Sequence, residues 1–461
     1  MSVGGPSALV ERDLRRLLGD DAVLPGTTAA YLSDQTETRG LHGHADAVCL
    51  PSRQEQVASA VTWCYERGIP IVPRGGGTGY AGGAVPIEGG VVVALERIAH
   101  VRSFDPLLWR IQVEAGVRTA DLRRVVRENG LFFPPDPGAA DQSQIGGNVA
   151  TNAGGPHAFK YGVTGAWVTG IEAVLPPGEL VRVGGAIRKD VAGYDLKNLL
   201  IGSEGSLGIV TAVWLKLIPP PEASLPVVGF YGDIGSGTGA IAAVLGNGIG
   251  AAALEYLDAG ALDAARGSFP APVPDAARFM VIAEADGSAA EAVRLQAELG
   301  EALADGAETV YAPAFAAEAA ALWRWRDGVS IAVTAQRGGK ISEDIVVPID
   351  RLADAVNGTL EIAARHGLPA CSWGHAGDGN LHSTFMVDAL DEAELVQAQE
   401  AAYELFRLAV ELGGSISGEH GTGWVKRGQL ARQWSPRLLE VHAAVKDAFD
   451  PKNLMNPGKK E

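Results

Sequence analysis

Apolar positions near the start of the chain alternate between short runs typical of strands and longer periodic segments typical of helices. Residues 45–50 have the pattern of a strand, and Ser52 opens a helix that runs to about residue 66. Ser52 is the expected N-cap, because Glu55 follows three residues later. Residues 69–73 form a short apolar run that leads directly into glycines. The pattern predicts a βαβ unit that ends in a glycine-rich turn.

The rest of the first 220 residues continues the alternation of strands and helices. Strands are predicted at 90–95, 109–114, 171–175 and 209–218, and helices at 7–18 and 119–129. These residues therefore read as one α/β unit with long loops. Pro219–Pro221 marks its end, since proline interrupts both central strands and helix interiors.

After residue 221 strands alternate with alanine-rich helices, which predicts an open antiparallel sheet backed by helices. The expected strands are 227–231, 253–257, 279–285, 309–311 and 344–347, and the expected helices are 239–245, 289–304, 314–336, 352–366 and 392–412. Two further strands flank a histidine-rich turn near residue 378.

Composition and charge narrow the class of protein. Hydrophobic residues make up 47% and charged residues 20%, which is typical of a globular chain. The net charge of −17 argues against nucleic acid as the main partner. Cys49, Cys64 and Cys371 include no close pair, so they provide no disulfide framework or zinc ribbon. No apolar stretch reaches the roughly 20 residues of a membrane span, and the N-terminus has no signal-peptide core. We expect a cytoplasmic protein, with docking on a membrane partner left open.

The 60 glycines are nearly twice the usual share, and many of them lie in three clusters. Residues 73–83 read Pro-Arg-Gly-Gly-Gly-Thr-Gly-Tyr-Ala-Gly-Gly and follow a short strand. Glycines let backbone N–H groups approach an anion such as a pyrophosphate. The spacing matches neither a dinucleotide-binding fingerprint nor a P-loop. A simple flexible loop is the alternative interpretation of this cluster alone.

The other two clusters combine small residues with polar side chains. Residues 143–155 follow Pro134–Gly138, and residues 189–196 run into 201–210. Serine, threonine and asparagine among glycines suit a long polar ligand that lies along the backbone.

These three segments, in this order, resemble the FAD-binding domain of the vanillyl-alcohol oxidase superfamily. The nearest branch contains D-lactate dehydrogenase, the glycolate oxidase D-subunit and D-2-hydroxyglutarate dehydrogenase, and the resemblance covers about residues 25–458. It implies an α+β fold with a two-subdomain FAD-binding domain of the PCMH type, an antiparallel-sheet substrate (cap) domain, and a C-terminal segment that returns to the flavin. The domains implied are an N-terminal helical segment at 1–44, the FAD-binding domain at 45–221, the substrate domain at 222–415 and the C-terminal segment at 416–461.

The resemblance also implies which residues bind FAD. The residues around the pyrophosphate are Arg74, Gly75, Gly76, Gly77, Thr78 and Gly79. Those along the flavin and ribityl chain are Pro135, Asp136, Ser143, Gly147, Asn148, Thr151, Asn152 and Gly155. Those over the adenine half are Gly205, Ile209 and Val210, and the C-terminal signature adds Asn456. Some relatives attach FAD through a histidine in the first loop. Residues 74–83 contain none, so we predict non-covalent FAD. Thr164–Trp167 departs from relatives that carry a charged pair there.

The most informative segment is His375-Ala-Gly-Asp-Gly-Asn-Leu-His382. Residues 370–375 and 380–387 read as strands joined by a tight turn, and facing Cβ atoms in a hairpin lie about 5 Å apart. Both imidazoles could then reach one ion, although two structural histidines are the alternative. A third ligand must come from elsewhere, and Glu419 is available. By the resemblance, His375, His382 and Glu419 bind a divalent metal, with Zn²⁺ and Mn²⁺ both compatible with N/O ligands.

Glu419 and His420 would face opposite sides of an extended chain, so that one binds metal while the other faces the substrate. The resemblance makes His420 the general base, a task for which the near-neutral pKa of histidine is suited. Asn380 would orient the substrate hydroxyl. Arg326 and Lys340 match the positions of substrate-binding cations in relatives, whereas Arg324 is a weaker candidate. Packing and surface charge are the alternative roles for these cations.

The resulting hypothesis is an FAD-dependent dehydrogenase that oxidises a D-2-hydroxy acid (D-lactate, glycolate or D-2-hydroxyglutarate) to the 2-oxo acid, with metal-assisted deprotonation of the hydroxyl and hydride transfer to flavin N5. The rivals are an FAD-dependent alcohol or sugar oxidase, a non-catalytic FAD-binding subunit, and a metallohydrolase without flavin. The electron acceptor stays open among a quinone, a cytochrome, an electron-transfer flavoprotein and oxygen. A homodimer is also left open.

Overall fold

The structure, a computed structural model, describes residues 6–36 and 40–461, which divide into two compact units. Unit 1 comprises the described residues up to Gly154 together with Val163–Pro220 and Glu419–Glu461, and unit 2 comprises Gly155–Gly162 and Pro221–Gly418. Neither unit is contiguous in sequence. The domain limits expected from the sequence are not tested by this division and stay predictions.

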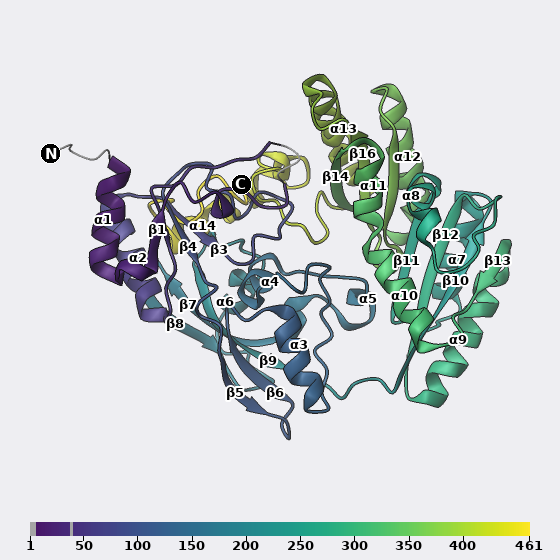
Figure 1. The fold of residues 1–461 in the computed structure, drawn as a ribbon, viewed down its shortest axis with the longest axis horizontal. Coiled ribbons are helices and arrows are strands. Elements are labelled where there is room, and N and C mark those ends of the chain that lie inside the picture. The colour runs from purple at the N-terminus through teal and green to yellow at the C-terminus, as the bar shows by residue number, and fades with distance from the viewer. Residues whose placement is uncertain (1–5, 37–39) are drawn as a thin grey trace. The chain divides into compact units, whose positions relative to one another are not determined.

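Unit 1 contains two sheets (Figure 1). The first has the order β1-β2-β4-β3, and its strands are β1 (Val23–Pro25), β2 (Ala47–Cys49), β4 (Val91–Ala94) and β3 (Ile71–Arg74). Strands β2, β4 and β3 are parallel, and helix α2 (Gln54–Arg67) connects β2 to β3. The predicted βαβ unit is therefore confirmed. The second sheet is antiparallel with the order β5-β6-β9-β7-β8, and its strands are β5 (Val101–Asp105), β6 (Arg110–Glu114), β9 (Ile209–Lys216), β7 (Val168–Leu175) and β8 (Glu179–Gly184).

The expected N-cap of α2 is wrong. Arg53 occupies the N-cap position, and the helix begins at Gln54. Ser52 lies one residue too early, and its backbone N–H and hydroxyl bond to the side-chain oxygen of Gln56, at 2.8 and 3.1 Å. The Gln56 side chain, in the first turn of the helix, thus accepts hydrogen bonds from the residue before the N-cap.

Helices complete unit 1 around a shared core. They are α1 (Pro6–Leu18), α3 (Thr119–Glu128), α4 (Ile145–Thr151), α6 (Leu196–Leu200) and α14 (Pro436–Phe449). The core joins α1, α2 and the first sheet to Val174 and Ile209 of the second sheet and to Met455. The C-terminal segment reaches this core beside β3, where Ile71 N–H donates to Leu454 O and Asn456 N–H donates to Ile71 O, at 2.8 and 2.7 Å. The predicted return of the chain to the flavin-binding half is confirmed.

Unit 2 is built on one sheet with the order β13-β10-β12-β11-β15-β16-β14, in which all neighbours are antiparallel. Its strands are β10 (Ala223–Tyr231), β11 (Ala253–Asp258), β12 (Phe279–Gly287), β13 (Ala307–Tyr311), β14 (Gly339–Val346), β15 (Ala370–His375) and β16 (Asn380–Val387). The open antiparallel sheet predicted for this half is confirmed. The strand predicted at 344–347 spans Gly339–Val346 and therefore includes Lys340.

The helices of unit 2 pack on both faces of this sheet. They are α5 (Ala158–Tyr161), α7 (Ile234–Gly246), α8 (Ala259–Ala265), α9 (Ala289–Ala304), α10 (Ala316–Asp327), α11 (Val329–Arg337), α12 (Leu352–Arg365) and α13 (Glu392–Glu411). Ile341 and Phe385 pack with α12 and α13 on one face. Leu257 and Trp373 pack with α8, α10 and α11 on the other face. Side chains alternate between the faces along each strand, so this packing fixes which residues line each face.

The single helix predicted over 314–336 is wrong, because the chain forms two helices there. Gly328 ends α10 and begins α11, and its N–H bonds to Arg324 O and Trp325 O at 3.2 and 3.0 Å. Glycine has the weakest helix propensity after proline, which makes this residue the point of interruption. Arg326 therefore lies in the last turn of helix α10, whereas Lys340 lies in strand β14.

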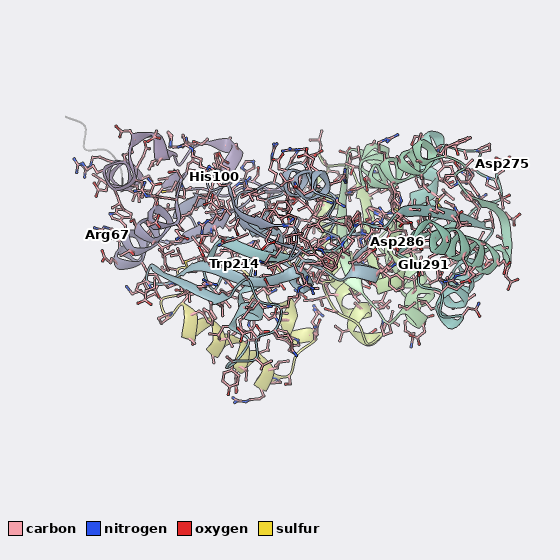
Figure 2. The ribbon with its side chains drawn as sticks, turned by 90° about the horizontal axis from the view of Figure 1, so that it is seen from below. Arg67, His100, Trp214, Asp275, Asp286 and Glu291 are labelled. Carbon is pink, nitrogen blue, oxygen red and sulfur yellow. The ribbon has the colours of Figure 1, made fainter. Side chains whose placement is uncertain are left out.

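A short segment between the second glycine cluster and β7 belongs to unit 2. Asp286 on β12, labelled in Figure 2, accepts hydrogen bonds from the Tyr161 hydroxyl and the Lys160 ammonium. Glu284, two residues earlier on the same face, lies 2.8 Å from His157 Nε2 and accepts from Trp323 Nε1 at 2.5 Å. Both carboxylates are buried, so these pairs hold helix α5 firmly against the sheet.

None of the helices in the described part of the chain combines the length and apolar composition that a membrane crossing requires.

The packing of unit 2 makes a direct prediction for Phe385→Ala. Phe385 is fully buried between β16 and helices α12 and α13, so removing its ring should destabilise the protein by about 3–5 kcal/mol. Urea denaturation followed by circular dichroism measures the change. Leu390→Ala, at a position 92% exposed, is the control and should change stability by less than about 0.5 kcal/mol. Equal stability of the two variants would contradict the assigned core.

Candidate functional site

The two histidines of the His375–His382 segment lie on one face of unit 2. Strands β15 and β16 pair antiparallel, with His375 opposite Asn380 and His382 opposite Trp373, so the two histidines are diagonal neighbours. Their ring centroids are 5.4 Å apart, and the rings are nearly perpendicular. Both side chains are buried. The predicted hairpin is confirmed, and its register brings the imidazoles together as expected.

Glu419 completes a set of three candidate ligands. One ligand atom from each of His375, His382 and Glu419 lies within 4.8 Å of the other two. Two nitrogens and one carboxylate oxygen at such a spacing fit a divalent cation of the zinc or manganese type. A metal would be held there by these three residues, which are the three predicted from the sequence.

Residues just before Glu419 are fixed by a buried carboxylate of β14. Asp344, opposite His382 in the sheet, accepts the Gly418 N–H at 2.8 Å and the Ser417 hydroxyl at 3.2 Å. The chain is therefore held at the point where it leaves unit 2. Glu419 and His420 do not lie in an extended strand, and His420 Nε2 is 3.8 Å from Glu419 Oε1. The expectation that the two side chains face opposite sides of an extended chain is wrong, because the backbone bends here.

Glu255 was not found from the sequence, although it contacts two of the predicted residues. Its carboxylate lies 2.6 Å from His375 Nδ1 and forms an ion pair with Arg326 at 2.5 Å. Burial alone would raise the pKa of the Glu255 carboxyl, but His375 and Arg326 hold that pKa below its usual value. The available signal was a carboxylate in the otherwise apolar strand Ala-Leu-Glu-Tyr-Leu.

Two candidate substrate-binding side chains keep buried polar atoms without hydrogen bonds to any described residue. In Arg326 these atoms are Nε and Nη2, of which Nη2 is ion-paired with Glu255. In Asn380 the atom is Oδ1, whereas its amide nitrogen donates to Ile345 O at 3.0 Å. Buried polar groups are costly to leave unpaired, so such atoms are typical of a ligand site.

Lys340 lies on the same face of the sheet as the histidines. Its ammonium donates to the Ser330 carbonyl at 2.9 Å, also contacts the Ser330 hydroxyl, and sits 5.4 Å from the centre of the Trp373 ring. Burial lowers the pKa of Lys340 to about 8. The charge of this lysine therefore changes close to neutral pH.

In unit 1, the first two glycine clusters meet backbone to backbone. A Cβ on Gly75 would lie 3.3 Å from the Gly147 Cα, and a Cβ on Gly76 would overlap the Gln142 carbonyl oxygen. At position 76 only glycine fits, and at position 75 a side chain would require the Gly147 backbone to shift. By contrast, a Cβ on Gly79 would meet no described atom within 4 Å. A tight backbone cradle with an open side fits the pyrophosphate of FAD.

Several polar side chains predicted to line the flavin hold these loops in shape. Asn148 and Ser143 both bond to the Thr119 hydroxyl, at 2.7 and 2.8 Å. The Asn152 amide oxygen accepts the Gly165 N–H at 2.8 Å, and Asn152 has a φ of 56°. Thr151 donates to the Gly147 carbonyl at 3.1 Å.

The guanidinium of Arg74 is likewise engaged in the framework. It is buried and donates to Ser33 O at 2.8 Å and to Ala30 O at 2.9 Å. The other predicted cofactor positions are close to these loops in sequence or structure. Thr78 and Asp136 are partly buried, Pro135, Ile209 and Val210 are buried, Gly205 packs near Pro73, and Gly155 is the first residue of the segment assigned to unit 2.

His420 sits in a loop that two residues missed by the sequence reasoning hold in place. Tyr80, in the first glycine cluster, stacks on the His420 ring with centroids 4.7 Å apart. Glu204, in the third cluster, accepts the backbone N–H groups of Thr422 and Gly423 at 2.9 and 2.7 Å. The loop that carries the candidate base is therefore tied to the same glycine clusters that form the cradle.

Asn456 joins the C-terminal signature to this arrangement. Its amide nitrogen donates to Gly83 O and Glu204 O, at 2.9 and 2.7 Å, and its oxygen accepts from Lys459 at 2.7 Å. The residue is buried with a φ of 46°. Its side chain thus links the first and third glycine clusters.

Two family models match the chain. The model for the FAD binding domain matches residues 45–184, and that for the C-terminal domain of FAD linked oxidases matches residues 220–460. The chain belongs to the FAD-linked oxidase family. It is an FAD-linked oxidoreductase, and the rival interpretation of a metallohydrolase without flavin is set aside.

Curated relatives within this family cover most of the chain. The glycolate oxidase subunit GlcD of Bacillus subtilis is 38% identical over 416 residues, which are 90% of this chain and 88% of the relative. A D-lactate dehydrogenase of Anaerostipes hadrus is 34% identical over 426 residues, with 88% and 87% covered. A D-2-hydroxyglutarate dehydrogenase of Xanthomonas citri is 34% identical over 425 residues, with 90% and 88% covered.

Solved structures agree on the fold. p-Cresol methylhydroxylase with substrate bound superposes with a TM-score of 0.82 at 18% identity, covering 100% of this chain and 98% of that one. This likeness confirms the predicted α+β architecture of an FAD-binding domain followed by an antiparallel-sheet domain.

The open side of the cradle leads to a prediction for Gly79→Ala. The new methyl group meets no described protein atom, so stability without flavin should be unchanged, whereas FAD affinity should fall by roughly tenfold because the methyl occupies the side where the nucleotide lies. FAD titration of the stripped protein by fluorescence quenching measures the loss. Gly239→Ala, equally uncrowded but in helix α7 of unit 2, is the control and should bind FAD normally. Normal affinity in Gly79→Ala would move the cofactor away from this loop.

Proposed function

We propose that this FAD-linked oxidoreductase oxidises a D-2-hydroxy acid to the corresponding 2-oxo acid. Three relatives with 34–38% identity bear the names of enzymes for glycolate, D-lactate and D-2-hydroxyglutarate, all of which are 2-hydroxy acids. The observation that carries the proposal is the gathering of His375, His382 and Glu419, with the unsatisfied donors of Arg326 in the same unit as the two histidines. A cation site and a carboxylate-binding group together suit a substrate that carries a hydroxyl next to a carboxylate.

Arg326, Lys340 and Asn380 each have a different role in binding the substrate. Arg326 binds the substrate carboxylate, because its buried Nε–H has no hydrogen-bond partner among the described residues and guanidinium has enough donors to do so while Nη2 stays ion-paired with Glu255. Lys340 adds a second positive charge on the same face of the sheet. Asn380 offers its buried amide oxygen to the substrate hydroxyl and orients it. A neutral substrate would leave the arginine donors unpaired, which favours acids over alcohols or sugars.

His420 removes the hydroxyl proton. Stacking on Tyr80 and the anchoring of the following residues by Glu204 restrict the orientation of the imidazole. The divalent metal, when held by His375, His382 and Glu419, supplies the positive charge that makes the hydroxyl more acidic. FAD, bound non-covalently, supplies the acceptor for the hydride from the substrate carbon.

Anaerobic bleaching of the yellow protein by a panel of D- and L-2-hydroxy acids tests the proposal. We expect bleaching by D-acids or glycolate that falls at least 100-fold in rate after the metal is removed with a chelator and returns when Zn²⁺ or Mn²⁺ is added back. His420→Ala should retain FAD but lose bleaching by about 10²–10⁴-fold, the usual contribution of a general base. His442→Ala, on α14 of the same unit, is the matched control. Bleaching by simple alcohols but by no acid would refute the proposed substrate class.

The lowered pKa of Lys340 predicts a pH dependence of substrate binding. The protonated form, which predominates below about pH 8, attracts a carboxylate, and the neutral form above that pH does not. KM for the acid should therefore rise roughly tenfold or more between pH 7 and 9.5, because a charged hydrogen bond is lost. Steady-state kinetics across this range give the profile.

Lys340→Arg provides the matched control for that profile, because arginine keeps its charge throughout the range. This variant should show a flatter KM profile even if its absolute affinity differs. A KM that stays constant with pH in the wild-type enzyme would remove Lys340 from substrate binding.

A further inference from the structure

Glu255 occupies a position that is unfavourable for a carboxylate by itself. Every residue of β11 is buried, and Glu255 is fully enclosed at the centre of the seven-stranded sheet of unit 2. Taking an ionised carboxylate out of water costs several kcal/mol unless charged or hydrogen-bonding partners compensate. The partners of Glu255 therefore indicate why a carboxylate stands in this strand.

Those partners are the candidate ligand His375 and the candidate substrate group Arg326. The register of β11 and β15 places Glu255 directly opposite His375, so the two side chains leave the sheet on the same face. One carboxylate oxygen, Oε1, lies 2.6 Å from His375 Nδ1, and the other, Oε2, lies 2.5 Å from Arg326 Nη2. A single rigid group thus connects a candidate metal ligand to a candidate substrate cation.

The contact with Nδ1 has a defined effect on the imidazole. A carboxylate at Nδ1 keeps the proton on that nitrogen, so any bond to a cation is made through Nε2. It also stops rotation of the ring, which stands nearly perpendicular to the His382 ring. Carboxylates placed in this way typically raise metal affinity by 10–100-fold.

We propose that Glu255 is a positioning residue that sets the metal affinity of this protein by fixing the tautomer and orientation of His375, while its second oxygen holds Arg326 beside the same centre. The inference rests on the proposed function, because it requires the metal site of His375, His382 and Glu419. It adds a residue that contacts neither metal nor substrate and nevertheless determines how tightly the metal is held.

Asp258 shows what a purely structural carboxylate looks like on the same strand. It is also buried, and it accepts backbone N–H groups of Ala261 and Ser372, at 2.9 and 2.8 Å. It therefore ties β11 to β15 as Glu255 does, but it bonds to no ring nitrogen of His375. Asp258→Asn consequently matches Glu255→Gln in burial, in strand and in the replacement of a carboxyl by an amide.

The test compares metal affinities of the FAD-loaded, full-length proteins. Zn²⁺ affinity is measured by competition with a chromophoric chelator, and the visible absorption of the Co²⁺-substituted protein reports the ligand geometry. We expect Glu255→Gln to bind Zn²⁺ about 10–100-fold more weakly, with an altered Co²⁺ spectrum and unchanged FAD content. Asp258→Asn should bind Zn²⁺ within about threefold of the wild type.

A second variant covers the case in which Glu255→Gln does not fold. Glu255→Asp keeps the charge but withdraws it from Nδ1 by one methylene, so we expect an intermediate loss of affinity. Wild-type affinity in either Glu255 variant overturns the inference, and so does an equal loss in Asp258→Asn, which would reveal general damage to β11. If the wild-type protein holds no metal, the proposed metal site itself fails, and that outcome is recognised before any variant is made.

Discussion

The alternation of side chains along antiparallel strands is the constraint on which the candidate site depends. Glu255, His375, His382 and Lys340 come from four adjacent strands, β11, β15, β16 and β14, and all leave the sheet on one face. A shift of one residue in any strand would turn its side chains to the opposite face. The apolar packing of residues such as Phe385 against α12 and α13 makes such a shift costly. Apolar packing on the face opposite the site thus keeps the site residues in register.

Much of this arrangement could be predicted from the sequence because its causes are local. A tight turn between two short apolar runs was enough to predict the hairpin, and its register makes His375 and His382 diagonal neighbours whose rings approach each other. The glycine clusters predicted backbone loops open to an anion, and in the structure Gly76 has no room for a side chain. Glu419 was available in a second glycine-rich segment with a histidine, and the family resemblance assigned it as the third ligand.

Other features depend on partners far apart in the sequence, and no local pattern reports them. Glu255 lies 120 residues before His375, and only the strand order of the finished sheet makes them neighbours. In the sequence, Tyr80 has no feature that distinguishes it from other loop residues, and only the fold places it next to His420. The interruption at Gly328 was missed for a different reason. The apolar period continues across this residue, so the pattern could not show that the helix ends and restarts.

The path of the chain also imposes an order on its synthesis. Strand β3 gives way to the first glycine cluster early in the sequence, yet the residues that pair beside it, Leu454–Asn456, are translated only after all of unit 2. At about 5–20 residues per second, tens of seconds separate the two segments. The whole of the seven-stranded sheet is translated in that interval. The hydrogen bonds that the C-terminal segment makes beside β3 therefore form only after the seven-stranded sheet has been translated, and a nascent chain stalled within that sheet lacks them.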